Sequence, residues 1–307
     1  MNKESEREIK VSIIMLVYNH EKYIAEAIES VINQKTDFDF ELLIGEDCST
    51  DNSRRIIEKY EKKYPNIIKV KYWGKNIGMN GNGFYLLKNA TGKYIAALDG
   101  DDYYTDEYKL QKQFNFLEKN PEYSCVYSNV CCVDKEGKEG GSGINKYPIK
   151  DEGEYSFEMI KKLKLIGQAS SSMYINFYKV LDEKVLSLME DCKCNGDHKI
   201  GLVLACIGKI YYMKDIMTCH RVIFKGDSWS AQTVGKNLEY ERYLMYLELG
   251  KFSKEGFGRQ YCEKGFEKRI VVDSIRTCFR EFNFNNIKVT LQIIFTFVKR
   301  LLKNELC

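Results

Sequence analysis

Apolar residues in the first hundred positions alternate between short continuous runs and runs with helical spacing. A continuous run at 11–17 predicts a buried strand, and apolar residues at 24, 28, 31 and 32 predict a following helix with Asn19 as its candidate N-cap. Further strands are predicted at 40–44, 67–72 and 94–98. Two more helices are predicted, one starting within 49–52 and ending before Pro65, the other running from a glycine-rich loop at 78–83 to Lys88. This alternation predicts an α/β fold with a mostly parallel sheet flanked by helices.

The pattern changes in the second half of the chain. A strand is predicted at 125–133 and a polar loop at 135–146, followed by helices at 157–163, 179–189 and 198–206. Beyond about residue 225 the apolar spacing is helical to the end of the chain. We therefore predict a sheet-containing domain at 1–225 and a helical C-terminal extension at 226–307.

The composition narrows the class of protein. Of the 307 residues 44% are hydrophobic, and 47 basic against 44 acidic residues leave a net charge of +3, so we expect no nucleic-acid partner. The 11 cysteines include no C-x-x-C pair and only 3 histidines accompany them, which favours reduced thiols in a cytoplasmic protein over a zinc site. A polar N-terminus and the lack of a run of about 20 apolar residues predict neither a secretory signal nor a membrane-spanning helix.

Carboxylates follow two of the predicted strands. Asp99, Asp101 and Asp102 come directly after the strand at 94–98, and Asp47 follows the strand at 40–44. Because ligands bind beyond the carboxyl ends of parallel strands, we expect both groups at one edge of the sheet. Crowded carboxylates repel each other and are suitable ligands for Mg²⁺ or Mn²⁺. The alternative is a solvated acidic turn that caps the next helix.

Asp47 and Tyr18 are candidates for binding a nucleobase. Asp47 stands where a carboxylate can accept hydrogen bonds from a uracil or guanine ring, and the residues at 49–51 can cap the next helix without it. Tyr18 ends the first predicted strand, where its ring either stacks on a base or packs against the protein.

Three ordered motifs carry a family resemblance. The segments 11–19, 46–51 and 98–102 resemble those of family 2 glycosyltransferases, and the resemblance extends over residues 9–230. These are inverting enzymes with a GT-A fold, that is, a mostly parallel mixed sheet flanked by helices. The resemblance implies a nucleotide-diphosphate sugar as donor, with a UDP-sugar favoured, and Mn²⁺ or Mg²⁺ as cofactor.

The resemblance also implies roles for individual residues on the donor side. Tyr18 matches the residue that stacks on the base, Asp47 the carboxylate that recognises the base, and Asn76 lies in the segment next to the nucleotide. Within the acidic motif, Asp99 is expected to contact the ribose. Asp101 and Asp102 are expected to bind the metal.

Later segments match the family's acceptor and catalytic regions. Asp197 corresponds to the catalytic base, although an aspartate at the start of a helix also serves as a cap. Ser170 and Ser171 belong to a hydroxyl-rich stretch that the family places near the acceptor, or else to an ordinary turn.

The segment 220–223 departs from the family pattern. Arg221 matches a residue that contacts the diphosphate, but Ile223 stands where many members carry a metal-binding histidine. On a strand, His220 would face the side opposite to Ile223, so we expect a structural histidine there rather than a ligand.

The last predicted helix, 287–303, is basic and amphipathic. It is suited either to an anionic membrane surface, at the inner face of the membrane, or to docking on the catalytic domain or a second subunit of a homo-oligomer.

Together these features predict an inverting, metal-dependent glycosyltransferase that acts on a saccharide or lipid-linked saccharide in surface polysaccharide synthesis. Two alternatives stay open: another metal-dependent nucleotide transferase, and a catalytically inactive nucleotide-binding module. No G-x-G-x-x-G follows the first predicted strand, which disfavours a dinucleotide-dependent oxidoreductase.

Overall fold

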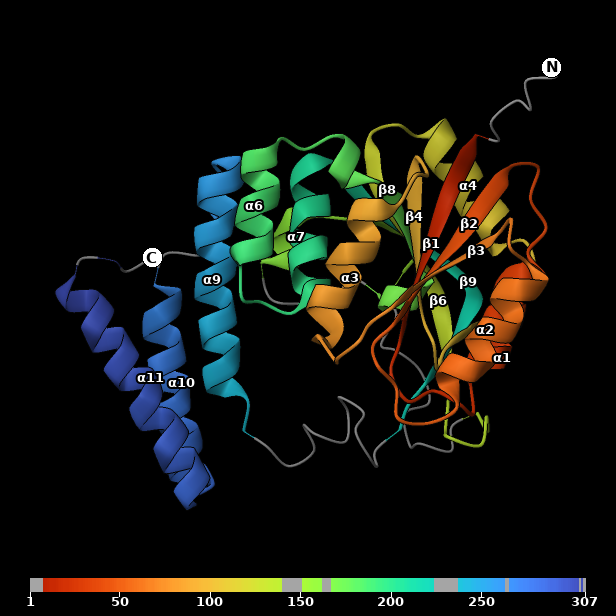
Figure 1. The fold of residues 1–307 in the computed structure, drawn as a ribbon. Helices are drawn as coiled ribbons and strands as arrows, with labels where there is room; N and C mark the ends of the chain where they lie inside the picture. The colour runs from red at the N-terminus through yellow and green to blue at the C-terminus, as the bar shows by residue number, and fades with distance from the viewer. Residues whose placement is uncertain are drawn as a thin grey trace. The chain divides into compact units, whose positions relative to one another are not determined.

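The computed structural model describes residues 8–139, 151–161, 167–223, 237–262, 265–303 and 305. The chain divides into two compact units (Figure 1). Unit 1 comprises 1–160, 165–182 and 196–223, and unit 2 comprises 161–164, 183–195 and 224–307. The predicted boundary between residues 225 and 226 and most of the loop at 135–146 lie outside the described residues, and the boundary stays a prediction.

Unit 1 is built on one mixed sheet. Among the described residues the strand order is β3-β2-β1-β4-β8-β6-β9-β5, with β7 also paired to β9. The strands β1 to β4 pair in parallel, β8 runs antiparallel to both β4 and β6, and β6 and β9 are parallel. The strand bounds are β1 Ile9–Val17, β2 Asp39–Glu46, β3 Ile68–Tyr72, β4 Tyr94–Asp99, β5 Tyr103–Tyr104, β6 Tyr123–Val133, β7 Gly153–Tyr155, β8 Ser172–Ile175 and β9 Lys209–Arg221.

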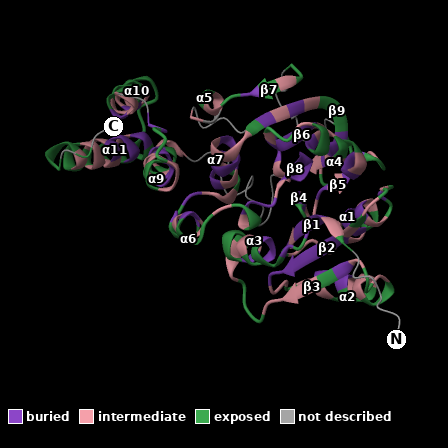
Figure 2. Cartoon of the chain, turned by 90° about the horizontal axis from the view of Figure 1, so that it is seen from above, coloured by how far each residue is buried: buried purple, intermediate pink, exposed green. Residues whose placement is uncertain are grey.

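Helices cover both faces of this sheet. Figure 2 shows α1, α2 and α4 on one face and α3 and α7 on the other. The helices of unit 1 are α1 Ile24–Ile32, α2 Ser53–Lys63, α3 Gly78–Asn89, α4 Lys109–Lys119, α5 Phe157–Ile160 and α7 Gly196–Ile207, with short 3₁₀ turns at Ala169–Ser171 and Phe177–Lys179. The predicted fold class is therefore confirmed.

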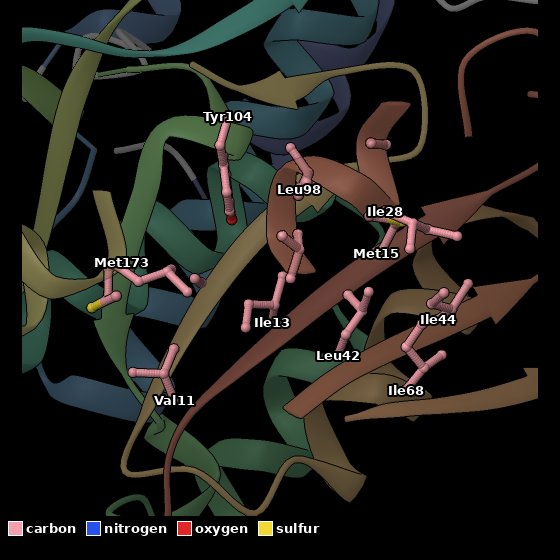
Figure 3. Packing of buried hydrophobic residues seen from close by; sticks show 14 of the residues in the cluster. Val11, Ile13, Met15, Ile28, Leu42, Ile44, Ile68, Leu98, Tyr104 and Met173 are labelled. Carbon is pink, nitrogen blue, oxygen red and sulfur yellow. The ribbon is translucent and has the colours of Figure 1, made fainter. Parts of the chain in front are cut away.

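The core lies where β1 and its neighbours meet the first helices. Val11, Ile13 and Met15 alternate along β1 and are completely buried against Ile28 of α1 and Leu42 of β2 (Figure 3). Residues of the opposite parity on β1 are also largely buried, because helices lie on the second face as well. This double burial explains why the strands appear in the sequence as continuous apolar runs.

Two local predictions were wrong. The glycine-rich segment is not a loop before a helix, because α3 begins at Gly78 and contains it. Asn19 is not the N-cap of α1, because its backbone is left-handed (φ 58°) and its side chain instead accepts a hydrogen bond from the Thr50 amide.

Unit 2 is helical in its described part, as predicted for the C-terminal extension. It contains α6 Glu183–Asp191, α9 Glu239–Phe257, α10 Phe266–Arg280 and α11 Phe284–Leu302. Tyr243 of α9 packs with Val289 and Ile293 of α11, and its hydroxyl donates a 2.6 Å hydrogen bond to Glu267 of α10. None of the helices described in the structure is long and apolar enough to span a bilayer.

Candidate functional site

The two acidic groups meet at the carboxyl end of β1. Leu16 of β1 is in register with Gly45 of β2 and with Asp99 of β4. The amides of Asp47 and Gly100 donate to consecutive β1 carbonyls, those of Val17 and Leu16. The predicted convergence of the two groups at one sheet edge is thus present in the fold.

The loops after β1 and β2 are tied to each other by reciprocal hydrogen bonds. The amides of Asn19, His20 and Glu21 donate to the side chains of Ser49, Ser53 and Asp51 in that order, and the amides of Thr50 and Asn52 donate back to the side chains of Asn19 and Glu21. The polar residues at 49–51, which looked like redundant helix caps, therefore mainly join two loops, although Asp51 also accepts from the Ser53 amide. Tyr18, at the base of this pair of loops, is 37% exposed.

Asp47 is buried and holds the start of α3. Its two carboxylate oxygens accept hydrogen bonds from the amides of Ile77 (2.8 Å) and Gly78 (2.9 Å). The Asn76 side chain also accepts from the Gly78 amide, at 3.1 Å. Asp47 and Asn76 thus lie together at the N-terminus of α3, where orphan backbone donors are available.

Asp102 is the most enclosed member of the acidic cluster. Its carboxylate accepts hydrogen bonds from the Ser170 hydroxyl (2.6 Å), the side-chain amide of Gln168 (3.0 Å) and the Arg221 backbone N–H (2.9 Å). It also lies 3.1 Å from His220 Nδ1. Its side chain has no exposed area. Protein donors thus surround the Asp102 carboxylate, and its expected role as a metal ligand stays a prediction.

His220 belongs to this cluster, which the sequence interpretation did not foresee. It lies on β9, opposite Cys132 of β6, and its side chain is 23% exposed. Burial alone would lower the imidazole pKa, but the charge and hydrogen bond of Asp102 raise it to about 9. His220 and Asp102 are 118 positions apart in the sequence, so their contact could not be read from local spacing. The only signal in the sequence was that His220 stands beside Arg221 in the family segment.

Asp99 and Asp101 are crowded by like charges. Burial and the charges of Asp102, Asp101 and Asp197 raise the pKa of Asp99 well above its usual value. Burial and Asp102 also raise the pKa of Asp101, against the opposing effect of His20 and His220. Such crowding is the condition in which a bound cation lowers the free energy of a site.

Asp197 reaches the same cluster from another element. It lies in the first turn of α7, and burial raises its carboxyl pKa while the His220 charge acts in the opposite direction. The Asp197 charge acts in turn on Asp99. The fold therefore brings the predicted base close to the predicted donor-binding carboxylates.

Arg221 is buried rather than exposed to the site. Its Nε donates to the Asp101 carbonyl (3.0 Å), its Nη1 to the Asp134 carbonyl (3.0 Å) and its Nη2 to Glu26 (2.8 Å). The guanidinium also stacks over Tyr23, with its carbon 4.4 Å from the ring centroid. In this arrangement Arg221 supports the backbone of the acidic turn, and its expected contact with the diphosphate stays a prediction.

Ser170 and Ser171 also lie beneath the cluster. Both are completely buried. The Ser170 hydroxyl donates to Asp102 and accepts from the Asp99 amide, and the Ser171 hydroxyl donates to the Gln168 carbonyl. Both hydroxyls therefore support the cluster from within the protein, and the predicted acceptor contact stays a prediction.

A metal ion at this site would be bound partly by the protein and partly by a bound substrate. No group of three or more metal-ligating side chains forms a ready cation site in the part of the chain that the structure describes. A cation that bridges a diphosphate needs only one or two carboxylates from the protein. The crowded Asp99 and Asp101 fit that need, and beside them the buried His20 Nδ1 has no hydrogen-bond partner among the described residues.

Comparison with known proteins agrees with this geometry. The family model of glycosyl transferase family 2 matches residues 12–185. The chain is 37% identical over 139 residues to the putative glycosyltransferase EpsE of Bacillus subtilis, covering 45% of this chain and 49% of EpsE. It is 31% identical over 228 residues to the minor teichoic acid biosynthesis protein GgaB of the same species, covering 74% of this chain and 24% of GgaB. The chain thus spans at most about half the length of these curated relatives.

The fold has a clear counterpart among solved structures. Residues 1–349 of Staphylococcus aureus TarS, in complex with UDP-GlcNAc, superpose with a TM-score of 0.65 and 18% sequence identity, over 95% of this chain and 81% of that one. This likeness establishes the GT-A fold. The family model matches more than half of the residues, and the chain therefore belongs to glycosyl transferase family 2.

Proposed function

We propose that the chain transfers a sugar from a nucleotide-diphosphate sugar to a saccharide or lipid-linked saccharide acceptor, with inversion at the anomeric carbon. The observation that carries the proposal is the convergence of Asp99, Asp101 and Asp197 at one edge of the sheet, from β4, the turn after it and α7. Burial raises the pKa of all three carboxyl groups, and neighbouring carboxylates raise those of Asp99 and Asp101 further. Raised pKa values are expected for groups that meet a cation and a reacting hydroxyl.

The donor nucleotide would lie over the ends of β1 and β2. Tyr18 would stack on the base, and Asp47, which keeps one lone pair on each oxygen beyond its two backbone bonds, would accept from it. Asn76 would lie next to the nucleotide and Asp99 would bind the ribose. A UDP-sugar is the favoured donor, and the UDP-GlcNAc complex of the similarly folded TarS supports that choice.

Asp101 would hold Mn²⁺ or Mg²⁺ together with the donor diphosphate, while Asp102 stays within the protein network. When bound, the cation supplies positive charge that stabilises the departing diphosphate. The Arg221 side chain keeps the backbone of Asp101 in place through its bond to the Asp101 carbonyl.

Asp197 would act as the general base. An acceptor hydroxyl oxygen forms a bond to the anomeric carbon on the face opposite the diphosphate, the bond from that carbon to the diphosphate oxygen breaks, and the hydroxyl proton passes to the Asp197 carboxylate. Burial raises the pKa of Asp197 and so makes it a stronger base than an exposed aspartate. The products are the elongated acceptor and the nucleoside diphosphate.

The acceptor would be a growing surface polysaccharide or its lipid-linked precursor, in keeping with the resemblance to GgaB. The reaction would then take place in the cytoplasm or at the inner face of the membrane.

A donor screen tests the proposal. Purified chain is incubated with UDP-sugars and GDP-sugars and Mn²⁺, and binding and slow donor hydrolysis are followed, with Asp197→Asn as the matched variant. We expect one donor to bind and to be hydrolysed, with hydrolysis but not binding reduced in the variant. If a donor binds without being hydrolysed, and Asp197→Asn changes nothing, the chain is an inactive nucleotide-binding module. If no nucleotide sugar binds, the glycosyltransferase assignment is overturned.

A further inference from the structure

The outward face of α11 is apolar although the helix already buries its other face. Val289 and Ile293 point into the small core of unit 2. On the opposite side of the helix, Phe284, Leu291 and Phe295 are 84%, 60% and 72% exposed. A helix docked on its neighbours normally turns charged residues to the solvent, so this second apolar face is unusual.

The exposed residues form one continuous stripe. Phe284, Leu291, Phe295 and Leu302 are separated by seven, four and seven positions, spacings that place them above one another along the helix. Phe279 and Phe282, in and just after the last turn of α10, are 81% and 78% exposed and extend the apolar surface at the α10–α11 turn. Isolated exposed apolar residues are common, but an aligned set of large ones marks a contact surface.

The charged residues of α11 itself have one sign. The sequence of α11 contains no acidic residue, and it carries exposed Lys288 and Lys299, followed by exposed Lys303. Lys288 lines the same shallow groove as Phe284 and Leu291. At the α10–α11 turn, Arg280 ends α10 and the exposed Glu281 follows it, next to the exposed phenylalanines. The stripe on α11 is therefore flanked by cations, and the turn carries one charge of each sign.

We propose that this face of α11, with the α10–α11 turn, lies on the surface of a membrane that contains anionic phospholipids. The apolar side chains would enter the boundary between headgroups and acyl chains, while the flanking lysines contact phosphate groups. A second copy of the chain is a poorer occupant, because a symmetric contact through this stripe would bring Lys288 and Lys299 of one copy near those of the other. The opposite face of α11 packs on α9 and α10 within unit 2.

Vesicle co-sedimentation of the full chain tests the proposal independently of sugar transfer. Vesicles of phosphatidylcholine alone are compared with vesicles that also contain phosphatidylglycerol, at low and high salt. We expect partitioning into the anionic vesicles to be at least about tenfold stronger, and to weaken with salt. Absence of partitioning into either vesicle would overturn the proposal.

Variants locate the contact. Phe284→Ser with Phe295→Ser should abolish partitioning, Lys288→Gln with Lys299→Gln should remove the preference for anionic vesicles, and Phe284→Leu with Phe295→Leu should retain binding. Val180→Ser, at a 54% exposed apolar residue of unit 1, is the matched control and should change nothing. Because all these side chains are exposed, circular dichroism should stay unaltered. Equal partitioning of the serine double variant and wild type, or a dimer in light scattering that this variant dissociates, would refute the membrane assignment.

Discussion

The Asp102 carboxylate lies 3.1 Å from Nδ1 of His220, and this contact joins the turn after β4 to the end of β9. The same carboxylate accepts from Ser170, Gln168 and the Arg221 backbone, so one buried group ties three segments of unit 1 together. Ile223 stands where many family members carry a histidine. The same segment still supplies an imidazole to the carboxylate cluster, from His220. Asp102 and Asp101 should consequently behave differently when mutated.

Asp102→Asn should destabilise the protein by roughly 2–4 kcal/mol, because the variant leaves the partly buried His220 and the other donors to Asp102 without a charged partner. Asp101→Asn should leave the metal-free protein as stable as wild type or slightly more stable, because it removes a charge that burial and the Asp102 carboxylate disfavour. Denaturant unfolding measures both effects. Calorimetric titration with UDP and Mn²⁺ should show that Asp101→Asn loses most of the affinity, and equal destabilisation by the two variants would contradict this division of roles.

Asp197→Asn should lower the transfer rate by roughly 10²–10⁴-fold, the usual contribution of a general base. Donor affinity should change little, because Asp197 is assigned to the acceptor hydroxyl. Parallel measurement of turnover and of nucleotide binding separates the two effects. A large loss of donor affinity with unchanged turnover would assign Asp197 to the donor instead.

His220 and the buried Lys109 should affect stability with opposite dependence on pH. Burial lowers the pKa of Lys109 from 10.5 to about 7, so between these values the unfolded chain binds the extra proton and stability rises with pH. The pKa of His220 is raised from 6.5 to about 9, so the folded chain binds the extra proton in that range and stability falls as pH rises.

The two contributions can be separated in the metal-free protein by comparing each variant with wild type. Between pH 7 and 9, the free energy of unfolding of wild type minus that of Lys109→Met should increase with pH. The corresponding difference for His220→Gln should decrease. If the two stability differences changed with pH in the same direction, one of the two groups would not have the pKa described.

Gly100→Ala should destabilise the protein by roughly 1–3 kcal/mol, the usual cost of overpacking. A Cβ at Gly100 would lie 2.7 Å from His20 Nδ1, 3.0 Å from Val17 Cγ2 and 3.1 Å from the Leu16 carbonyl oxygen. Gly74→Ala is the matched control, because a Cβ there meets nothing within 4 Å and its stability should be unchanged or slightly higher. The melting temperatures of the two variants measure this effect. Equal melting temperatures would argue against close packing under the acidic turn.

The alternation of strands and helices was predictable because each element is marked by its own residues. The run at 11–17 is buried on both faces of the sheet, and such strands have a continuous apolar pattern. The glycine-rich segment was misassigned because local propensity disfavours helix there, whereas Asp47, just after β2, holds the N-terminus of α3.

The arrangement of the carboxylate cluster was only partly predictable. The position of Asp99 and Asp101 at a strand end follows from the sequence pattern, because the last residue of a parallel strand faces the ligand edge. The roles of Ser170 and Arg221 depend on contacts with Asp102 and Asp101 across 68 and 120 positions, which no local spacing encodes. Long-range hydrogen bonds of this kind become visible only when the chain is folded.

The reciprocal hydrogen bonds between the loops after β1 and β2 have a thermodynamic consequence for any nucleotide that binds over them. Asn19 and Cys48 hold left-handed backbone conformations (φ 58° and 59°) while their neighbours are bonded across the loops. The cost of ordering this backbone is met when the protein folds and does not recur when the ligand arrives. Binding of a nucleotide over these loops should therefore carry only a small penalty in conformational entropy.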